Sequence, residues 1–207
     1  ITDKCIDWPT TERLLRHALG WDRATLVASP EAAPGSEREA DFRRLVRERA
    51  RRVPLQHLTG TQAFWKQELR VTPDVLIPRP ETELVVEAAL AILRETGRPV
   101  IVDVGTGSGC IALALAAERA DAELHATDVS EAALAVARDN ARRLGLAGRV
   151  AFELGDLLEP VEAGIRGRAD LVVSNPPYVG SEERESLAPE VRDHEPALAL
   201  FPPGDAL

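Results

Sequence analysis

From Val100 onward, short apolar segments alternate with helical segments, and this alternation constrains the fold more than any other feature of the chain. Strand patterns occupy residues 100–104, 123–127, 149–154 and 169–174, with helical sequence between them. Such alternation is typical of a parallel sheet with helices on both faces. It predicts an α/β fold with a Rossmann-like sheet, in which ligands bind beyond the carboxyl ends of the strands.

The first eighty residues instead begin with helical periodicity and end with two short strands, at 62–66 and 68–72. A helix is predicted after them at 83–96. The expected helix caps are polar side chains at the helix starts: Thr10 or Thr11, Asp22, Ser36 in a capping box with Glu39, and Thr82. The chain is therefore predicted to contain a small N-terminal helical domain (1–58), a β-hairpin linker (59–80) and a sheet domain (81–207).

Charge is distributed unevenly along the chain. Residues 1–80 carry 14 Lys and Arg against 11 Asp and Glu, whereas residues 81–207 carry 11 against 23, so their net charges are +3 and −12. Domains that bind nucleic acid are usually basic, because they neutralise phosphates. The acidic sheet domain therefore predicts no direct nucleic-acid binding.

Composition argues against several other classes of protein. Cys5 and Cys110 cannot form a disulfide framework, and the four scattered histidines lack the spacing of a metal site. The longest apolar stretch is too short to span a bilayer, and the start of the chain lacks the apolar segment of a secretion signal. We expect no metal, no membrane segment and a cytoplasmic location.

A glycine turn follows the first strand of the sheet, with the pattern Asp103-x-Gly105-x-Gly107-x-Gly109. Glycines between a buried strand and a helix let backbone N–H groups approach a ligand, because no Cβ intervenes. The spacing differs from the G-x-G-x-x-G of dinucleotide-binding proteins, and Asp103 places a negative charge where a pyrophosphate would lie. The turn therefore favours a cationic ligand without phosphates.

Two further acids follow the next two strands. Asp128 stands nineteen residues after Gly109, where a carboxylate can accept both ribose hydroxyls, and Asp156 stands where a side chain can reach an adenine edge. With Asp103, this succession fits S-adenosylmethionine, whose sulfonium is positive. We predict that S-adenosylmethionine is the cofactor.

The fourth strand ends at Asn175-Pro176-Pro177-Tyr178. An amide or exocyclic amino nitrogen is a poor nucleophile, because its lone pair is delocalised. The Asn175 side-chain oxygen and the Pro176 carbonyl can accept its two hydrogens and orient it, while Tyr178 offers a flat wall. The motif therefore predicts N-methylation of a planar NH2 group without a general base.

Five segments together resemble the release-factor glutamine methyltransferases, the HemK/PrmC family. They are PLQHLTG (54–60), LIPRPETE (76–83), DVGTGSG (103–109), SNPPY (174–178) and HEPALAL (194–200). The resemblance runs from about Trp8 to the last residue, and LIPRPETE with NPPY is specific, because general amino-methyltransferases share only NPPY. It implies a Rossmann-like methyltransferase sheet that transfers a methyl group from S-adenosylmethionine to the Gln side-chain amide in the GGQ motif of class-1 peptide chain release factors.

By position, the resemblance assigns residues to the cofactor and to the substrate glutamine. The cofactor set is Asp103, Gly105, Thr106, Gly107, Ser108, Gly109, Asp128, Asp156, Leu157 and Asn175. The substrate set is Asn175, Pro176, Pro177 and Tyr178, of which Asn175, Pro176 and Tyr178 are expected to be catalytic. Leu157 replaces an aromatic residue of some members, and two C-terminal strands of the family domain are expected to be missing, which would leave an exposed sheet edge.

An arginine stripe, Arg43, Arg47 and Arg51, follows one face of a predicted helix. Such a run is either a solvated, salt-bridged helix face or a docking patch for an acidic or phosphate-rich partner. A pocket for one Gln side chain cannot select one loop in one protein. We therefore expect the helical domain to dock the release factor while Asn175–Tyr178 receives its loop.

Two alternatives stay open at this point. An adenine-N6 or guanine-N2 nucleic-acid methyltransferase would share Asp128 and the Asn-Pro-Pro-Tyr motif, but it should also carry a basic recognition region with aromatic side chains. A truncated, non-catalytic cofactor-binding fragment is the second alternative. Labelled S-adenosylmethionine, offered with a release factor or with duplex DNA, discriminates among these readings.

Overall fold

The computed structural model describes residues 6–29 and 31–202, and the chain divides into two compact units. The first unit contains the residues up to Gly60 together with Ala188–His194. The second contains Thr61–Leu187 together with the residues from Glu195 onward. The hairpin region thus belongs to the unit with the sheet, whereas a short C-terminal segment belongs to the unit with the N-terminal helices.

The first unit is helical. Its helices are α1 (Trp8–Leu19), α2 (Arg23–Ala28), α3 (Ser36–Ala50), α4 (Leu55–Thr59) and α9 (Pro189–His194). Helices α1 and α3 pack against each other, and Leu14 and Leu45 are buried. Arg49 is also buried, and its guanidinium donates to the Val53 carbonyl and to the Glu190 carboxylate, each at 2.9 Å. This ion pair holds α9 within the helical unit.

The cap of α1 differs from the predicted one. The helix begins at Trp8, because the Asp7 carboxylate accepts the backbone N–H of Thr10 at 2.8 Å. Thr10 and Thr11, the predicted caps, lie inside the helix. Asp is a strong N-cap, and Pro9 fits a first turn, where its missing N–H costs no hydrogen bond. Both residues favour the earlier start.

The predicted capping box of Ser36 and Glu39 is also wrong. Ser36 is the first helical residue, Gly35 precedes it, and no side chain caps the helix. A Gly cap leaves the first N–H groups of α3 without a side-chain acceptor. Asp22, in contrast, caps α2 as predicted, since its carboxylate accepts the Thr25 N–H at 2.7 Å.

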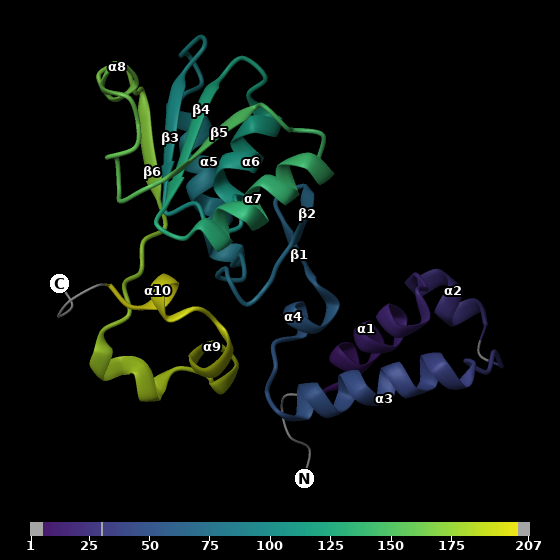
Figure 1. The fold of residues 1–207 in the computed structure, drawn as a ribbon. Coiled ribbons are helices and arrows are strands. Elements are labelled where there is room, and N and C mark those ends of the chain that lie inside the picture. The colour runs from purple at the N-terminus through teal and green to yellow at the C-terminus, as the bar shows by residue number, and fades with distance from the viewer. Residues whose placement is uncertain (1–5, 30, 203–207) are drawn as a thin grey trace. The chain divides into compact units, whose positions relative to one another are not determined.

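The second unit contains a parallel sheet with a β-hairpin (Figure 1). The sheet has the order β5-β4-β3-β6, formed by β3 (Val100–Val104), β4 (Glu123–Asp128), β5 (Val150–Leu154) and β6 (Leu171–Ser174). All three pairings in this sheet are parallel. Strands β1 (Thr61–Phe64) and β2 (Gln67–Arg70) form the antiparallel hairpin. The predicted α/β, Rossmann-like architecture is confirmed.

Helices lie on both faces of this sheet. They are α5 (Glu83–Ile92), α6 (Cys110–Glu118), α7 (Glu131–Arg143) and α8 (Ala163–Arg166), and α10 (Ala197–Leu200) lies near the end of the described chain. Two 3₁₀ turns, η1 (Pro80–Thr82) and η2 (Ser181–Ser186), complete the unit. The sequence did not predict α8, η2 or α10, which are all short. A helix of one or two turns has too few residues to show a clear period.

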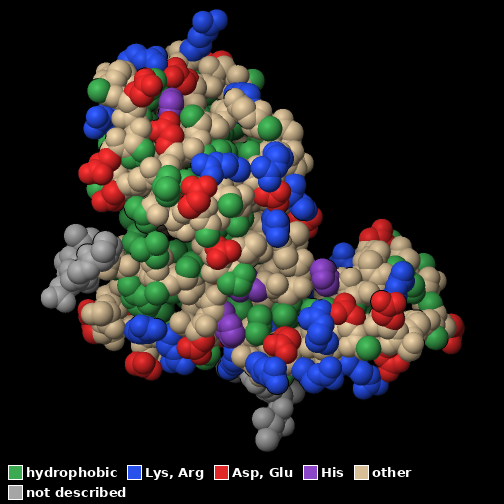
Figure 2. Space-filling view, in the orientation of Figure 1, with side chains coloured by type: hydrophobic (Ala, Val, Ile, Leu, Met, Phe, Trp, Pro, Cys, Tyr) green, Lys and Arg blue, Asp and Glu red, His purple; other side chains and the backbone are tan. Residues whose placement is uncertain are grey.

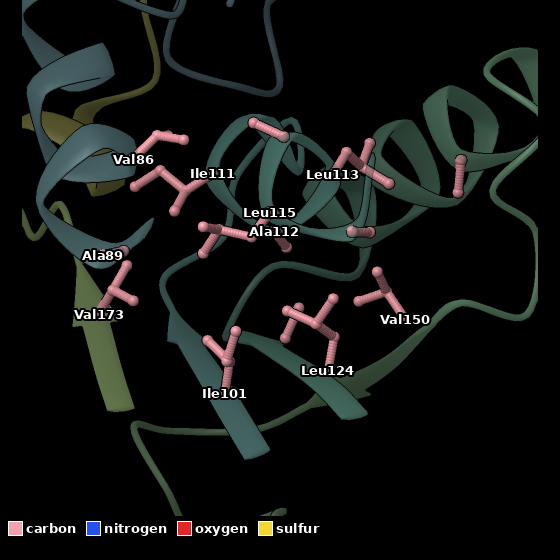
Figure 3. Close-up of a cluster of buried hydrophobic side chains, with 14 of the residues drawn as sticks. Val86, Ala89, Ile101, Ile111, Ala112, Leu113, Leu115, Leu124, Val150 and Val173 are labelled. Atoms are coloured by element: carbon pink, nitrogen blue, oxygen red, sulfur yellow. The ribbon is translucent and has the colours of Figure 1, made fainter. Parts of the chain in front are cut away.

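Apolar side chains fill the space between the sheet and its helices. Ile101 and Leu124 of the strands are buried with Ile111 of α6, and they point into a shared core (Figure 3). Val102 faces the opposite layer, where it packs in a cluster that includes Ile165 of α8. Full burial of such a side chain stabilises the fold by roughly 1.5–3 kcal/mol. Helices α5, α6 and α7 cover one face, whereas the segment around α8 covers only part of the other, where Val172 of β6 is 49% exposed. The predicted helical cover of both faces is therefore incomplete here. The carboxyl ends of the strands are the expected place for a ligand.

Helix α5 is shorter than predicted, and Thr82 does not cap it through its side chain. The turn η1 leads directly into the helix, and Thr82 has helical backbone angles. Pro80 fixes φ at the start of the turn, so the helical conformation begins before Glu83. The helix ends at Ile92 instead of Thr96.

Candidate functional site

Parallel register brings the predicted site residues to one edge of the sheet. Val104 of β3 is level with Thr127 of β4 and with Ser174 of β6. Asp128 and Asn175 are the next residues of their chains, and the glycine turn follows β3 at the same level. In open parallel sheets, ligands bind at this carboxyl edge (Figure 1).

The glycine turn has a backbone that only glycine adopts easily. Gly105, Gly107 and Gly109 have φ angles of 70°, 56° and 82°, in the left-handed region where a Cβ is strained. A Cβ at Gly109 would also lie 3.0 Å from Leu113 Cδ1 and 3.2 Å from the Ala137 Cβ. The first two glycines are therefore required by conformation, and the third also by close packing of α6 against α7.

Asp103 is a buried carboxylate beneath this turn. Its Oδ2 accepts the Thr106 hydroxyl at 2.7 Å and the Ala112 N–H at 3.2 Å, while its Oδ1 has no hydrogen-bond partner among the described residues. Burial raises the pKa of Asp103 to about 6, the two hydrogen bonds oppose that rise, and the charge of Asp128 adds to it. An unpartnered buried carboxylate oxygen is destabilising. Asp103 therefore fits a cationic ligand at the turn.

Asp128 joins the glycine turn to the start of α7. Its Oδ2 accepts the Gly107 N–H at 2.8 Å, and its Oδ1 accepts the Ser130 N–H at 2.9 Å. The residue is half-buried. Because each carboxylate oxygen has two lone pairs, both oxygens keep an acceptor position beside their backbone partner. Asp128 is thus fixed in place and still able to accept hydroxyl groups.

The loop after β5 is hydrogen-bonded to β4. Gly155 donates its N–H to the Asp128 carbonyl at 3.0 Å, and the Thr127 hydroxyl donates to the Leu157 carbonyl at 2.7 Å. Leu157 has a φ of 47°, and its side chain is 64% exposed, next to the exposed Asp156. Left-handed backbone at a non-glycine residue costs roughly 1–3 kcal/mol and is concentrated at functional sites. Thr127, which the sequence did not single out, holds this conformation.

The Asn-Pro-Pro-Tyr segment is an irregular loop that is fixed at both ends. At its start, the Ser174 hydroxyl donates to a carbonyl of β3 at 2.8 Å. At its end, Val179 donates its N–H to the Leu200 carbonyl at 3.0 Å. Asn175 is half-buried, and Tyr178 is 75% exposed. The loop thus presents an amide at the sheet edge and an aromatic ring to solvent.

Asn140 is a buried residue of α7 that organises the site and that the sequence did not indicate. Its Oδ1 accepts the Arg70 N–H at 2.7 Å, and its Nδ2 donates to the Arg70 and Ser108 carbonyls, each at 3.0 Å. These bonds join the hairpin and the glycine turn to α7. Arg70 is 70 residues away in sequence and Ser108 is 32 away. The one available signal was an amide on the apolar face of a helix.

The side chains of His125 and Cys110, which could indicate metal binding or nucleophilic catalysis, have surroundings that give them a structural role. His125 lies between Glu153 at 3.0 Å and Glu123 at 3.4 Å. Burial, followed by the charge of Asp103, raises the pKa of the Cys110 thiol to about 12, so this thiol is not an activated nucleophile. The described part of the chain contains no group of three or more His, Cys, Asp or Glu side chains placed to hold a metal ion. Within residues 6–29 and 31–202, no helix combines the length and the apolar character that crossing a membrane requires.

Comparison with known proteins gives two family matches and many relatives. Residues 82–193 match the methyltransferase small domain family, and residues 9–60 match the PrmC N-terminal domain family. The release factor glutamine methyltransferase of Cereibacter sphaeroides is 47% identical over 196 residues, which cover 94% of this chain and 67% of the relative. That of Bacillus subtilis is 44% identical over 201 residues, which cover 95% of this chain and 68% of the relative.

A solved structure has the same fold at low sequence identity. The catalytic domain of hMettl16, in complex with MAT2A 3′UTR hairpin 6, has a TM-score of 0.51 and 18% identity, over 66% of this chain and 51% of that one. This likeness concerns the fold alone. The two family matches and the relatives above 40% identity show more: this chain belongs to the family of release factor glutamine methyltransferases.

Proposed function

We propose that this chain transfers a methyl group from S-adenosylmethionine to the side-chain amide nitrogen of the Gln in the GGQ motif of class-1 peptide chain release factors. The observation that carries the proposal is the placement of Asn175–Tyr178 beside the glycine turn. Strand β6, which ends just before Asn175, pairs directly with β3, which ends just before the turn. A methyl donor and an amide acceptor can therefore meet at one sheet edge.

The cofactor would be held by three successive strand ends. S-adenosylmethionine supplies an electrophilic methyl group on a positively charged sulfur. Asp103 and the turn from Gly105 to Gly109 would hold its cationic end, because the turn encloses an unpartnered carboxylate oxygen. Asp128 would accept the ribose hydroxyls with the acceptor positions that Gly107 and Ser130 leave available.

The adenine would lie against the loop after β5. Asp156 is exposed there and can accept from the exocyclic amino group, and Leu157 presents an exposed apolar side chain on a strained backbone. Thr127 fixes the Leu157 carbonyl at 2.7 Å. A leucine packs on a base less strongly than an aromatic ring does, so the base contact contributes less here.

Asn175–Tyr178 would bind and orient the substrate glutamine. The Asn175 side-chain oxygen and the Pro176 carbonyl would accept the two hydrogens of the substrate amide, which turns its nitrogen toward the methyl donor. The two prolines restrict the backbone before the substrate arrives, and the exposed Tyr178 ring would stack on the planar amide. The nitrogen becomes acidic once it is alkylated, so no general base is required.

The helical domain (1–58) would dock the body of the release factor, with the hairpin linker (59–80) between it and the methyltransferase domain (81–207). Arg43 pairs with Glu39 at 2.7 Å and Arg51 with Glu48 at 2.9 Å, so these two arginines of the stripe form ion pairs with acidic residues of α3. Figure 2 shows Lys and Arg side chains gathered along α3. Such charges at the rim of an interface mainly increase the association rate. A cytoplasmic location accompanies this role in translation.

Methyl transfer to two candidate acceptors tests the proposal. The protein is incubated with S-adenosylmethionine labelled in its methyl group and with either a class-1 release factor or duplex DNA. We expect label in the release factor, and none in the release factor whose GGQ glutamine is changed to Glu. Label in DNA would favour a nucleic-acid amino-methyltransferase, which the charge of −12 on residues 81–207 already disfavours.

A further inference from the structure

Glu195 is a buried carboxylate that the methyl-transfer site does not use. Its side chain is 1% exposed, its Oε1 accepts from Arg79 Nη2 at 2.6 Å, and its Oε2 accepts the Ile77 backbone N–H at 3.3 Å. A buried charge is costly unless it is paired and hydrogen-bonded. Both carboxylate oxygens are bonded here, so the ion pair fixes the C-terminal segment to the segment before η1.

The residues after Glu195 form the single helical turn of α10, which contacts the end of the Asn175–Tyr178 loop. Pro196 precedes α10, and the carbonyl of Leu200, at the end of α10, accepts the Val179 N–H at 3.0 Å. Val179 follows Tyr178 directly in the chain. A proline and a helical turn have little freedom. The position of Glu195 is therefore transmitted to the end of the Asn-Pro-Pro-Tyr loop.

Arg79, the partner of Glu195, follows a segment that packs on helix α7. Val71 and Val75 are buried in a cluster with Ala133 and Val136 of α7. Helix α7 begins at the turn that Asp128 stabilises. The backbone that leads to Arg79 is thus packed on the helix that follows the proposed ribose site.

We propose that Arg79 and Glu195 are a positioning pair, which holds the Asn175–Tyr178 loop in one conformation relative to the sheet. The proposal rests on the proposed function, because it assigns that loop to the substrate amide. Ser174 fixes the start of the loop on β3, and the pair fixes its end through α10. A misplacement of about 1 Å at a reacting group lowers a rate by about 100-fold, so the pair acts on kcat and not on cofactor binding.

A single tyrosine makes the loop visible by spectroscopy. Tyr178 is the only tyrosine of the chain, so incorporation of 3-fluorotyrosine gives one ¹⁹F NMR signal, which reports on the loop independently of activity. Glu195→Gln keeps the shape and one acceptor but removes the charge. We expect this variant to broaden or split the signal, to lower kcat for release factor by about 10- to 100-fold, and to leave the Kd for S-adenosylmethionine within about threefold, on the scale of a small free-energy change.

A matched control removes a different ion pair from the same segment. Glu190→Gln breaks the pairing of Glu190 with Arg49 and Arg52, which lies within the helical unit. We expect it to leave the ¹⁹F signal unchanged, and to leave kcat on a short Gly-Gly-Gln peptide within about twofold. Arg79→Gln should reproduce the effects of Glu195→Gln, whereas Arg79→Lys, which keeps the charge, should restore most of kcat.

Three results would overturn the positioning pair. They are a wild-type signal and rate in Glu195→Gln, equal effects of Glu195→Gln and Glu190→Gln on the signal, and an Arg79→Lys variant as slow as Arg79→Gln. If Glu195→Gln does not fold, the two Arg79 variants decide alone. If the wild type transfers no methyl group to a release factor, the proposed function fails, while the ¹⁹F comparison still decides whether the pair holds the loop.

Discussion

The backbone N–H of Gly107 donates to the Asp128 carboxylate at 2.8 Å, so the glycine turn after β3 is hydrogen-bonded to the end of β4. The other oxygen of the same carboxylate accepts the Ser130 N–H, at the start of α7, at 2.9 Å. One side chain thus sets the position of the turn and of a neighbouring helix. It does so at the sheet edge where we place the ribose of the cofactor.

Asp128→Ala should therefore weaken the binding of S-adenosylmethionine by about 1–3 kcal/mol, the scale of lost hydrogen bonds to a charged group. Asp128→Asn keeps an oxygen for one backbone donor, so its loss should be smaller. Isothermal titration calorimetry on the folded variants measures both. An unchanged affinity in Asp128→Ala would remove the ribose assignment.

Asp103 should give the stability of the protein a distinct pH dependence. Burial raises the pKa of its carboxyl from 3.8 to about 6, so the folded state holds the proton more tightly than the unfolded chain does. The stability that this proton contributes is fully present below pH 3.8 and is lost as the pH rises through 6. A pKa that is higher by about 2 in the folded state corresponds to roughly 3 kcal/mol of folding free energy.

Asp103→Asn removes this titration. We expect the variant to be more stable than the wild type at pH 7.5 by up to about 3 kcal/mol, with the advantage disappearing near pH 4, while its affinity for S-adenosylmethionine is reduced. Urea denaturation of the ligand-free proteins at several pH values gives the difference. A stability difference that does not change with pH would show that Asp103 is not a strained carboxylate.

Asn140→Ala should destabilise the second unit. It would leave the N–H and carbonyl of Arg70 and the carbonyl of Ser108 without their side-chain partner. Each buried polar group that loses its partner costs about 1–3 kcal/mol, so a total of at least about 3 kcal/mol is expected for the three groups. Asn140→Asp has the same shape but cannot donate, and should be destabilising as well. Denaturation midpoints close to the wild type in both variants would show that these bonds are not important.

Reversal of the arginine stripe tests docking by the helical domain. With Arg43, Arg47 and Arg51 all changed to Glu, KM for intact release factor should rise, and more so at low salt, because rim charges act on association. Transfer to a short Gly-Gly-Gln peptide should barely change. Equal responses of both substrates, or of neither, would mean that the stripe is a solvated helix face.

The control for this variant has the same change in charge on the second unit. Arg94, Arg143 and Arg166 are exposed residues of that unit, and changing all three to Glu alters net charge by the same amount. We expect this control to leave KM for release factor within about twofold of the wild type, a change under 1 kcal/mol. A rise equal to that of the stripe variant would assign the effect to net charge.

The sheet and its edge were predictable because they follow from local patterns. The strand at 100–104 and the cap at Asp22 appear as predicted, since a buried apolar run and an aspartate before a helical period are both short-range signals. Asp103, Asp128 and Asn175 were singled out by the same reasoning, because each stands at or next to the carboxyl end of a strand. Parallel register then places them at one edge of the sheet.

The parts that the sequence did not reveal depend on contacts between distant residues. Asn140 bonds to Arg70 over 70 positions, and Glu195 bonds to Arg79 over 116. No window of sequence contains both partners. The start of α1 was predicted wrongly for a different reason. Asp7 and Thr10 are both good N-cap residues, and only the backbone angles of the folded chain select Asp7.

Asn175→Ala should separate cofactor binding from methyl transfer. Removal of one preorganised polar contact to the reacting group should lower the rate by about two to three orders of magnitude. The Kd for S-adenosylmethionine should change by a few-fold at most, because Asp103 and Asp128 are unaltered. A variant with near-normal turnover would contradict the proposed orientation of the amide by two acceptors.

The most direct test of the central claim is to locate the transferred methyl group. Intact release factor is treated with S-adenosylmethionine and wild-type protein or the Asn175→Ala variant, and tandem mass spectrometry of its peptides identifies the modified residue. We predict one methyl group on the side-chain nitrogen of the GGQ glutamine with the wild type, formed at least about 100-fold more slowly with the variant. A methyl group on any other residue, or equal rates for the two proteins, would contradict the account.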